Sequence, residues 1–261
     1  MQQPVGVFDS GVGGLSVLAS IRHALPAESL IYVADSKYMP YGCKSEPEIL
    51  ARCMQIADYF ATRECKAMVV ACNTATAASV AHIRHRYDCP VIGMEPAVKP
   101  AVQLSPSGVI GVLATRATCA SAKFNRLIDR FTHASILVQS APGLVERIEM
   151  GDLDGEETKA LLRRYLQPLL MQKVDTLVLG CTHYPFLQSQ IRAIVGEAVE
   201  IIDSGDAIAR ELARQLQSRD HLQCSDQHGE IEFLSSTAVM QYASLISRLW
   251  GAPIRLQELP F

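Results

Sequence analysis

The chain has 261 residues, of which 49% are hydrophobic and 20% charged, and its formal net charge is -3 at pH 7. This length and composition indicate a globular protein with one large domain or two of ordinary size. The slightly acidic balance excludes a general affinity for nucleic acid or anionic membranes, and no apolar segment approaches the ~20 residues that span a bilayer. The first four residues show neither the basic region nor the apolar core of a secretory signal, so a cytoplasmic location is expected.

The chain opens with a predicted strand, a glycine-rich turn and a helix. The strand Val5–Asp9 precedes three glycines between residues 11 and 14, and the helix Leu15–Ala24 stops before Pro26. The glycine spacing is not that of a dinucleotide site, but glycines at a helix start let backbone N–H groups approach a small anion such as a carboxylate. Asp9 fits two roles, a helix cap or a group that orients an ammonium or tunes a thiol.

A second predicted strand, Leu30–Ala34, leads into a polar and aromatic loop that contains Pro40, Tyr41 and Gly42. Loops after strands often contact ligands, although Pro-Tyr-Gly also fits a simple turn. A helix from about Glu46 to Arg63 is predicted to follow.

Two cysteines follow short apolar runs that are typical of buried strands. Cys72 comes after Ala67–Val70, and Cys181 comes after Thr176–Leu179. Open α/β sheets place ligands at this end of their strands. A cysteine there is more often a small buried hydrophobic residue than a catalyst, but the repeated context favours a shared chemical role. Small polar side chains that suit a helix start and a polar ligand come next, namely Asn73, Thr74 and Thr182.

The other cysteines do not indicate a disulfide framework or a metal site. None of the eight has C-x-x-C spacing. His82 and His85 share a helix face, but no cysteine or carboxylate completes a ligand set, and a basic, solvated helix end is the better reading. Free thiols and no metal are therefore expected.

The pattern of the first segment recurs in the second half of the chain. Residues 109–118 parallel residues 5–14, with Thr115 in the place of Asp9. The interval to the following cysteine is 63 positions from Asp9 and 66 from Thr115. This repeat predicts an α/β fold of two pseudo-symmetric three-layer α/β/α domains with mainly parallel sheets.

A proline-rich segment, residues 95–108, is predicted to cross between the domains. The tail has no counterpart in the second unit, so we expect it to return to the first. It comprises a helix near 205–218, a strand at 229–234 and a helix at 236–249. The predicted domains are residues 1–95 plus 208–261, and residues 96–207.

If both sheets present their strand ends to one cleft, the two thiols face each other across it, and such clefts are favoured sites for small ligands. A cysteine peptidase needs one thiol, a base and an oxyanion hole. Two symmetric thiols are better suited to removing a proton from one face of a carbon and returning one to the other. A free thiol has a pKa of ~8.5, so it acts as a base in one form and an acid in the other. The residues therefore predict two-base racemisation.

Other side chains are available to support the thiols. Asp9 is a candidate partner of Cys72, and His183 is a candidate partner of Cys181. Glu149 is a candidate to orient His183, although an exposed acid at a helix end is the alternative. No lysine stands in a context that suggests a Schiff base, so no cofactor is expected.

Four motifs, in their order along the chain, resemble those of bacterial glutamate racemases. They are Asp9–Ser16, Tyr32–Asp35 with Pro40–Gly42, Ala71–Ala75 and Leu179–Pro185. The resemblance extends from about residue 5 to residue 210. It implies interconversion of L- and D-glutamate without pyridoxal phosphate, which supplies D-glutamate for peptidoglycan.

The resemblance also implies roles for individual residues. Cys72 would act on the α-proton of D-glutamate and Cys181 on that of L-glutamate. The implied contacts with substrate are Asp9, Ser10, Pro40, Tyr41, Gly42, Asn73, Thr74, Thr115, Thr118, Thr182 and His183. Family members commonly carry Cys-Pro where this chain has Ala141-Pro142, with little expected consequence for chemistry.

Other functions remain open at this stage. A related racemase would act on aspartate or hydantoins, but aspartate racemases tend to carry glutamate where His183 stands. A non-catalytic role is the other alternative, because some glutamate racemases inhibit DNA gyrase, but the sequence offers no support for it and both thiols are present. The family implies a homodimer. It also implies activation of some members by UDP-N-acetylmuramoyl-L-alanine, linked to an N-terminal extension that this chain almost lacks.

Overall fold

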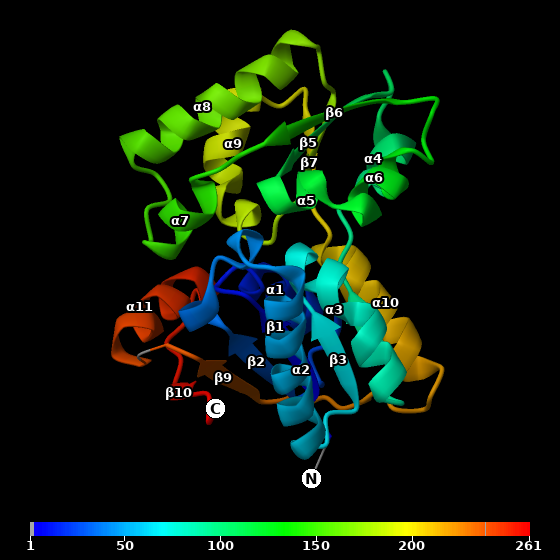
Figure 1. Cartoon of the computed structure of the whole chain (residues 1–261), viewed down its shortest axis with the longest axis vertical. Helices are drawn as coiled ribbons and strands as arrows, with labels where there is room; N and C mark the ends of the chain where they lie inside the picture. Colours follow the sequence, from blue (N-terminus) through cyan, green and yellow to red (C-terminus); the bar gives the residue numbers. More distant parts are fainter. Residues whose placement is uncertain (1–2, 238) are drawn as a thin grey trace. The chain divides into compact units, whose positions relative to one another are not determined.

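The computed structural model describes residues 3–237 and 239–261. The internal contacts divide the chain into two compact units, one that runs to Met94 and resumes at Gly205–Phe261, and one that comprises Glu95–Ser204. Figure 1 shows the helices and strands of both units. The predicted start at Met1 and Gln2, and residue 238 of the predicted last helix, lie outside the described residues.

The first unit is built on a six-stranded sheet in which every pairing is parallel. Its order is β10-β9-β2-β1-β3-β4. The strands β1 to β3 are continuously buried, as expected when helices cover both faces of a parallel sheet. The bounds are β1 Val5–Asp9, β2 Leu30–Ala34, β3 Ala67–Val70, β4 Val91–Gly93, β9 Ile231–Ser235 and β10 Leu256–Glu258.

The helices of the first unit form two layers. The connection from β1 to β2 and that from β2 to β3 run in opposite directions across the sheet, so right-handed crossovers place α1 and α2 on opposite faces. Accordingly α1 packs against α10 and α11, whereas α2 packs against α3. The bounds are α1 Leu15–Ala24, α2 Glu46–Thr62, α3 Asn73–Arg86, α10 Gly205–Gln217 and α11 Val239–Trp250, with short 3-10 turns η1 Ser36–Tyr38 and η2 Tyr41–Cys43.

The second unit has a four-stranded parallel sheet of order β6-β5-β7-β8. Figure 1 shows α8 and α9 on one side of this sheet and α4 and α6 on the other. The strands are β5 Val109–Ala114, β6 Ser135–Ser140, β7 Thr176–Leu179 and β8 Glu200–Ile202. The helices are α4 Val98–Leu104, α5 Arg116–Ala120, α6 Ala122–Ile128, α7 Leu144–Glu149, α8 Glu156–Met171, the turn η3 Tyr184–Leu187 and α9 Gln188–Val195.

The two sheets share one internal order. In the first, β2, β1, β3 and β4 are neighbours, and in the second β6, β5, β7 and β8 follow the same sequence of connections. The α/β class with two parallel sheets is therefore confirmed. Each unit also has a core of its own, centred on Phe8, Ile56 and Phe60 in the first and on Ile110, Val112 and Phe124 in the second.

Some element bounds differ from the predictions. The last helix begins at Val239, because Ser236 and Thr237 form a bend that follows β9 rather than the first helical turn. The three-residue strand β10 was not predicted, because a segment of that length carries no periodicity. Among the described residues, every helix is too short or too polar to cross a bilayer.

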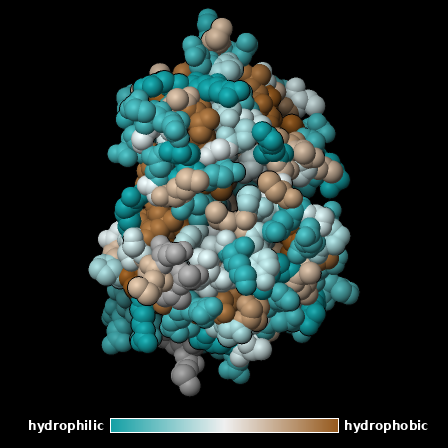
Figure 2. Space-filling view, turned by 60° about the vertical axis from the view of Figure 1, so that its left-hand side comes forward, coloured by the Kyte–Doolittle hydropathy of each residue, from teal (hydrophilic) through white to brown (hydrophobic). Residues whose placement is uncertain are grey.

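The surface carries few large hydrophobic side chains. Figure 2 shows the hydrophobic residues of one face as separate patches among hydrophilic ones. Of the large hydrophobic residues that are exposed, Phe261 is 45% accessible, and its ring lies over the guanidinium of Arg52.

Candidate active site

Cys72 stands where β3 gives way to α3. It is the N-cap residue of that helix, with an extended backbone, and its sulfur accepts a hydrogen bond from the Ala75 amide at 3.5 Å. The side chain is 7% exposed. The first turn of α3 therefore presents unsatisfied amide dipoles to the sulfur, an environment that stabilises negative charge.

Asp9 lies beside this cysteine at the end of the neighbouring strand β1. It is fully buried, and its Oδ2 accepts the Gly14 amide at 2.7 Å. The Ser10 hydroxyl donates to Asp9 Oδ1 at 3.4 Å and lies 3.6 Å from the Cys72 sulfur. Asp9 is thus not the N-cap of α1, which is Gly14. It fixes the turn before that helix and is linked to the thiol through Ser10.

The loop that contains Pro40, Tyr41 and Gly42 leaves the end of the adjacent strand β2. Tyr41 is buried and Gly42 is exposed. The Tyr41 hydroxyl donates to Asp35 Oδ2 at 2.5 Å. Burial, and then the neighbouring Cys53 and Asp35, raise the pKa of the Tyr41 hydroxyl above its usual range. Its role here is therefore that of a neutral hydrogen-bond donor.

Asn73 and Thr74 are the first two residues of α3 and are both half-buried. The structure therefore gathers Asp9, Ser10 and Cys72 at one end of the first sheet, together with the loop of Tyr41 and the start of α3. These are the predicted site residues of the first unit.

Cys181 occupies the equivalent place in the second unit, after β7 and Gly180. Its sulfur lies 3.7 Å from His183 Nδ1, and His183 Nε2 lies 2.7 Å from Glu149 Oε1. All three side chains are buried. Glu149, at the end of α7, is thus not the exposed helix-end acid of the alternative interpretation.

This arrangement determines the charge of the imidazole. Burial by itself lowers the pKa of His183, but the hydrogen bonds with Cys181 and Glu149 outweigh it and raise that pKa well above its usual value. This raised pKa favours the protonated ring, in which Nδ1–H is directed at the sulfur and Nε2–H at the carboxylate.

The threonines of the second unit lie at the ends of the same strands. Thr115 follows β5 and caps α5, since its Oγ1 accepts the Thr118 amide at 3.2 Å. Its hydroxyl also donates to Thr118 Oγ1 at 3.0 Å. Thr182, between Cys181 and His183, is 5% exposed.

Sequence reasoning assigned no role to Arg52 and did not foresee its partner Asp35. Arg52 is 6% exposed and Asp35 is fully buried. A signal for this pair was present, because Arg52 falls within the apolar stripe that Ile49 and Ile56 form on α2. A charged residue in such a stripe needs a buried partner.

No group of three or more histidine, cysteine, aspartate or glutamate side chains in residues 3–237 and 239–261 is arranged to hold a metal ion. The polar groups at the two strand ends are hydroxyls, amides and acid/base side chains, which suit a small polar molecule.

The model of the Asp/Glu/Hydantoin racemase family matches residues 5–212 of this chain. The chain belongs to this family. This confirms the resemblance found in its motifs. A glutamate racemase of Pseudomonas syringae pv. tomato is 57% identical over 215 residues, which are 82% of this chain and 78% of the relative.

Solved structures agree with this assignment. The glutamate racemase isoform RacE1 of Bacillus anthracis has a TM-score of 0.89 at 32% identity and covers 99% of this racemase and 98% of its own chain. The Escherichia coli glutamate racemase, solved with L-glutamate and the activator UDP-MurNAc-ala, has a TM-score of 0.86 at 36% identity, with 98% of each chain covered.

Proposed function

We propose that this protein is a glutamate racemase that interconverts L- and D-glutamate through Cys72 and Cys181, without a cofactor. The glutamate racemases at 57% and 36% identity support the substrate, and one of them was solved with L-glutamate. The observation that carries the mechanism is the equivalent placement of the two thiols. Each follows the third strand of its unit, β3 or β7, which pairs with the first strand of that unit on the side away from the second strand. The product D-glutamate serves peptidoglycan synthesis.

The proposed division of labour follows the two units. The first unit, for which the sequence predicts the bounds 1–95 plus 208–261, supplies Cys72, and the second unit, predicted as residues 96–207, supplies Cys181. This mechanism requires the two sulfurs to lie on opposite sides of the α-carbon when glutamate is bound. The bound amino acid then need not reorient, because one thiol removes the α-proton from one face and the other thiol delivers a proton to the opposite face.

The reaction that starts from D-glutamate removes one proton from the α-carbon and delivers another to it. The Cys72 thiolate takes the α-proton, so an S–H bond forms, the Cα–H bond breaks, and its electron pair spreads into the α-carboxylate. The Cys181 thiol then gives its proton to the opposite face of that carbon and becomes a thiolate. The reverse reaction exchanges the two roles.

The neighbours of each thiol support these steps. The His183 imidazolium stabilises the Cys181 thiolate by donating Nδ1–H, and Glu149 keeps the ring in that orientation. The Ala75 amide donates to the Cys72 sulfur, and the Ser10 hydroxyl, 3.6 Å from it, links that sulfur to Asp9. Fixed donors of this kind stabilise developing charge in a site from which water is excluded.

The substrate itself is held by the remaining polar groups. Backbone N–H groups near Gly42 and at the start of α3 suit a carboxylate, and hydroxyls and amides suit the second carboxylate and the ammonium. The residues proposed for these contacts are Ser10, Pro40, Tyr41, Gly42, Asn73, Thr74, Thr115, Thr118 and Thr182.

Incubation of the purified protein with L-glutamate in D2O tests this function. Circular dichroism should decay as D-glutamate forms, and NMR should find deuterium at the α-carbon of early product while remaining substrate stays protiated. L-Aspartate in place of glutamate distinguishes the related activity. Loss of optical activity with aspartate but not with glutamate would contradict the assignment.

Variants test the two thiols. Cys72→Ser and Cys181→Ser should each lower kcat by about 10³-fold or more, since a general acid or base contributes about 10²–10⁴-fold. Cys224→Ser, at an exposed cysteine, is the matched control and should be as active as the wild type. If either active-site variant kept full turnover, the two-thiol mechanism would be wrong.

A further inference from the structure

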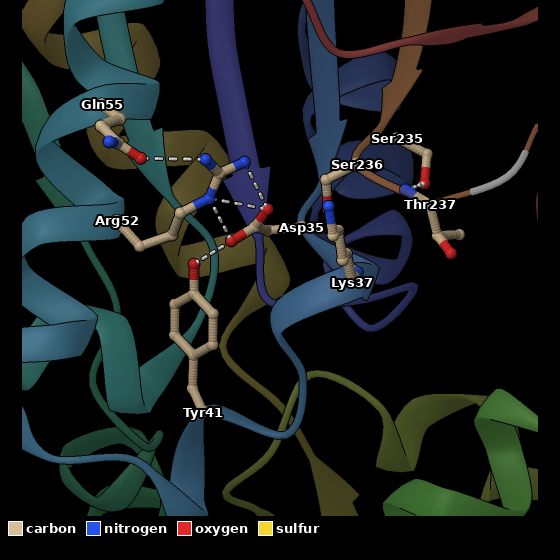
Figure 3. A network of polar contacts seen from close by, with 8 residues as sticks. All are labelled: Asp35, Lys37, Tyr41, Arg52, Gln55, Ser235, Ser236 and Thr237. Atoms are coloured by element: carbon tan, nitrogen blue, oxygen red, sulfur yellow. Dashed lines mark hydrogen bonds and ion pairs between the residues drawn. The ribbon is translucent and has the colours of Figure 1, made fainter. Parts of the chain in front are cut away.

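A buried ion pair stands behind the loop that carries Tyr41 and Gly42. The Arg52 guanidinium, on α2, donates from Nε and Nη2 to both oxygens of Asp35, at distances of 2.8 to 3.0 Å. Figure 3 shows this fork, with the Tyr41 hydroxyl bonded to the same carboxylate and Gln55 accepting from Nη1 of the arginine. Every bond in this network joins side chains of the first unit.

Aromatic rings hold the same guanidinium. The Tyr38 ring centroid is 4.3 Å from Arg52 Cζ, and the Phe261 ring centroid is 4.8 Å from it. A planar guanidinium stacks on aromatic faces and forms paired hydrogen bonds with a carboxylate, which an ammonium cannot reproduce. The stacking and the paired hydrogen bonds therefore fix the orientation of the guanidinium, and its positive charge is matched by the negative charge of Asp35.

The ion pair is linked to two parts of the proposed active site. Asp35 accepts the Tyr41 hydroxyl at 2.5 Å, and its backbone amide donates to the Asp9 carbonyl at 2.9 Å. One carboxylate thus connects α2 with the substrate loop, which we define as residues 36–43. A second tether of that loop, from the Lys37 amide to Ser236 Oγ, is exposed.

We propose that Arg52 is a positioning residue for glutamate binding. It holds Asp35, which holds the Tyr41 hydroxyl, and thereby fixes the substrate loop beside Cys72. Phe261 and Tyr38 keep the guanidinium in register with Asp35. Arg52 touches no reacting atom in this scheme. The proposal rests on the proposed function, because the affected quantity is the binding of glutamate.

A second arginine, Arg63 at the end of α2, has similar contacts but no link to the substrate loop. Arg63 also forms an ion pair and lies over an aromatic ring, with Glu232 at 2.6 Å and Tyr59 at 5.6 Å. Its side chain is 36% exposed, however, and its partners are not part of the substrate loop. Arg63→Gln is therefore the matched control for Arg52→Gln.

The first test compares steady-state kinetics with L-glutamate. Arg52→Gln should raise KM about tenfold or more with kcat within about threefold of wild type, the pattern of lost binding that is equal in ground and transition states. Arg63→Gln should change neither constant by more than about twofold, as expected for a partly exposed pair away from the substrate loop. Arg52→Lys should recover only part of the loss, since lysine restores the charge but not the fork.

A double-mutant cycle then decides whether Arg52 acts through the Tyr41 hydroxyl. Tyr41→Phe alone should also raise KM. If the two side chains act in one chain of contacts, the fold-increase in KM of the double variant Arg52→Gln/Tyr41→Phe will be well below the product of the fold-increases of the two single variants. Multiplicative effects would show that Arg52 acts elsewhere and would overturn the proposal.

Arg52→Lys keeps the question answerable if Arg52→Gln does not fold, because lysine retains the buried positive charge and loses only the paired hydrogen bonds and the stacking. An increased KM with an unchanged melting temperature supports the positioning role, and a wild-type KM contradicts it. The two proposals fail differently. A wild type that does not racemise glutamate removes the proposed function, whereas an active wild type with a normal KM in Arg52→Gln removes only this inference.

Discussion

The two thiols occupy equivalent strand ends but have different neighbours. Cys72 is approached by the Ala75 amide, a neutral donor, and by the Ser10 hydroxyl, which donates to the Asp9 carboxylate. Cys181 is approached by an imidazolium that is itself held by a carboxylate. Cys181 thus has a titratable ring in contact with its sulfur, so the ionisation of His183 should shape the pH dependence of activity together with that of the two thiols.

Glu149→Gln tests this dependence. The variant replaces the carboxylate, whose negative charge and hydrogen bond raise the pKa of His183, with a neutral amide, so the ring will lose its proton at a lower pH than in the wild type. The alkaline limb of the kcat profile should move to lower pH. At neutral pH kcat should fall about 10- to 100-fold, less than the loss of a general acid or base outright.

The same substitution has a defined effect on stability. A histidine whose pKa is raised on folding stabilises the native state fully below its unfolded pKa of ~6.5, and that contribution is lost as pH rises through the folded value. The melting-temperature difference between wild type and Glu149→Gln should therefore be largest at neutral and acidic pH. Glu157→Gln, at an exposed glutamate paired with Arg147, is the control. A pH-independent difference would contradict the assigned ring charge.

The acid/base residues could be named from the sequence, whereas contacts between distant residues were either candidates only, as for Glu149 and His183, or missed, as for Asp35 and Arg52. Short motifs placed Cys181 and His183 two positions apart, and proximity along the chain made their contact predictable. Glu149 comes from a helix 34 residues away, and Asp35 meets Arg52 across 17 residues. Such contacts depend on the packing of elements, which local patterns do not encode.

The turn between β1 and α1 is where element geometry bears most directly on the site. A Cβ added at Gly14 would lie 2.7 Å from the Asp9 Cβ, closer than real Cβ contacts. Gly6 lies in β1, the strand that ends at Asp9, but near the start of that strand. A Cβ added at Gly6 would meet the Phe60 ring at 2.6 Å. The two glycines therefore allow a clash near the site to be compared with a clash in the core.

Gly14→Ala should lower kcat/KM about 10- to 100-fold, because a displacement of about 1 Å at a catalytic group costs up to about a hundredfold. Both alanine variants should lose about 1–3 kcal/mol of unfolding free energy by overpacking. Only Gly14→Ala should alter kcat per folded molecule. Equal kinetics in the two variants, measured after correction for the folded fraction by denaturant titration, would argue against a role of Asp9 in catalysis.

Elements with strong signals were predicted within a residue or two, and weak ones were not. The helix α1 was predicted over its observed residues because an apolar stripe ends at Pro26, and α2 was predicted one residue too long. The short helices α5 and α6 were missed, since five and seven residues are too few for a periodic pattern. The parallel class followed from continuously apolar strands, but strand order required the structure.

At the scale of the whole molecule, the second unit is inserted into the first. Its two ends are joined by a hydrogen bond, from Ser204 Oγ to the Glu95 carbonyl at 2.7 Å. The hydrophobic clusters of the two units share no residue. Each unit therefore has a core of its own, as an independent domain requires.

Excision tests that independence. A chain in which residues 95–204 are replaced by a flexible linker of about four residues should fold, because chain closure over a short loop costs little. Residues 95–204 should fold as a separate polypeptide. Each should unfold in a single cooperative transition by circular dichroism, and neither should racemise glutamate. A fragment without a cooperative transition would show that the units are not independent domains.

The insertion also sets an order on the ribosome. The first unit begins with β1, but its sheet needs β9, and β9 is translated only after the last residue of the second unit. The second unit is contiguous, so its entire sequence emerges while the nascent first unit still lacks an edge of its sheet. Until then β2 exposes unpaired backbone groups, the kind of edge that invites wrong partners. The unit that is synthesised first is thus the last to be completed.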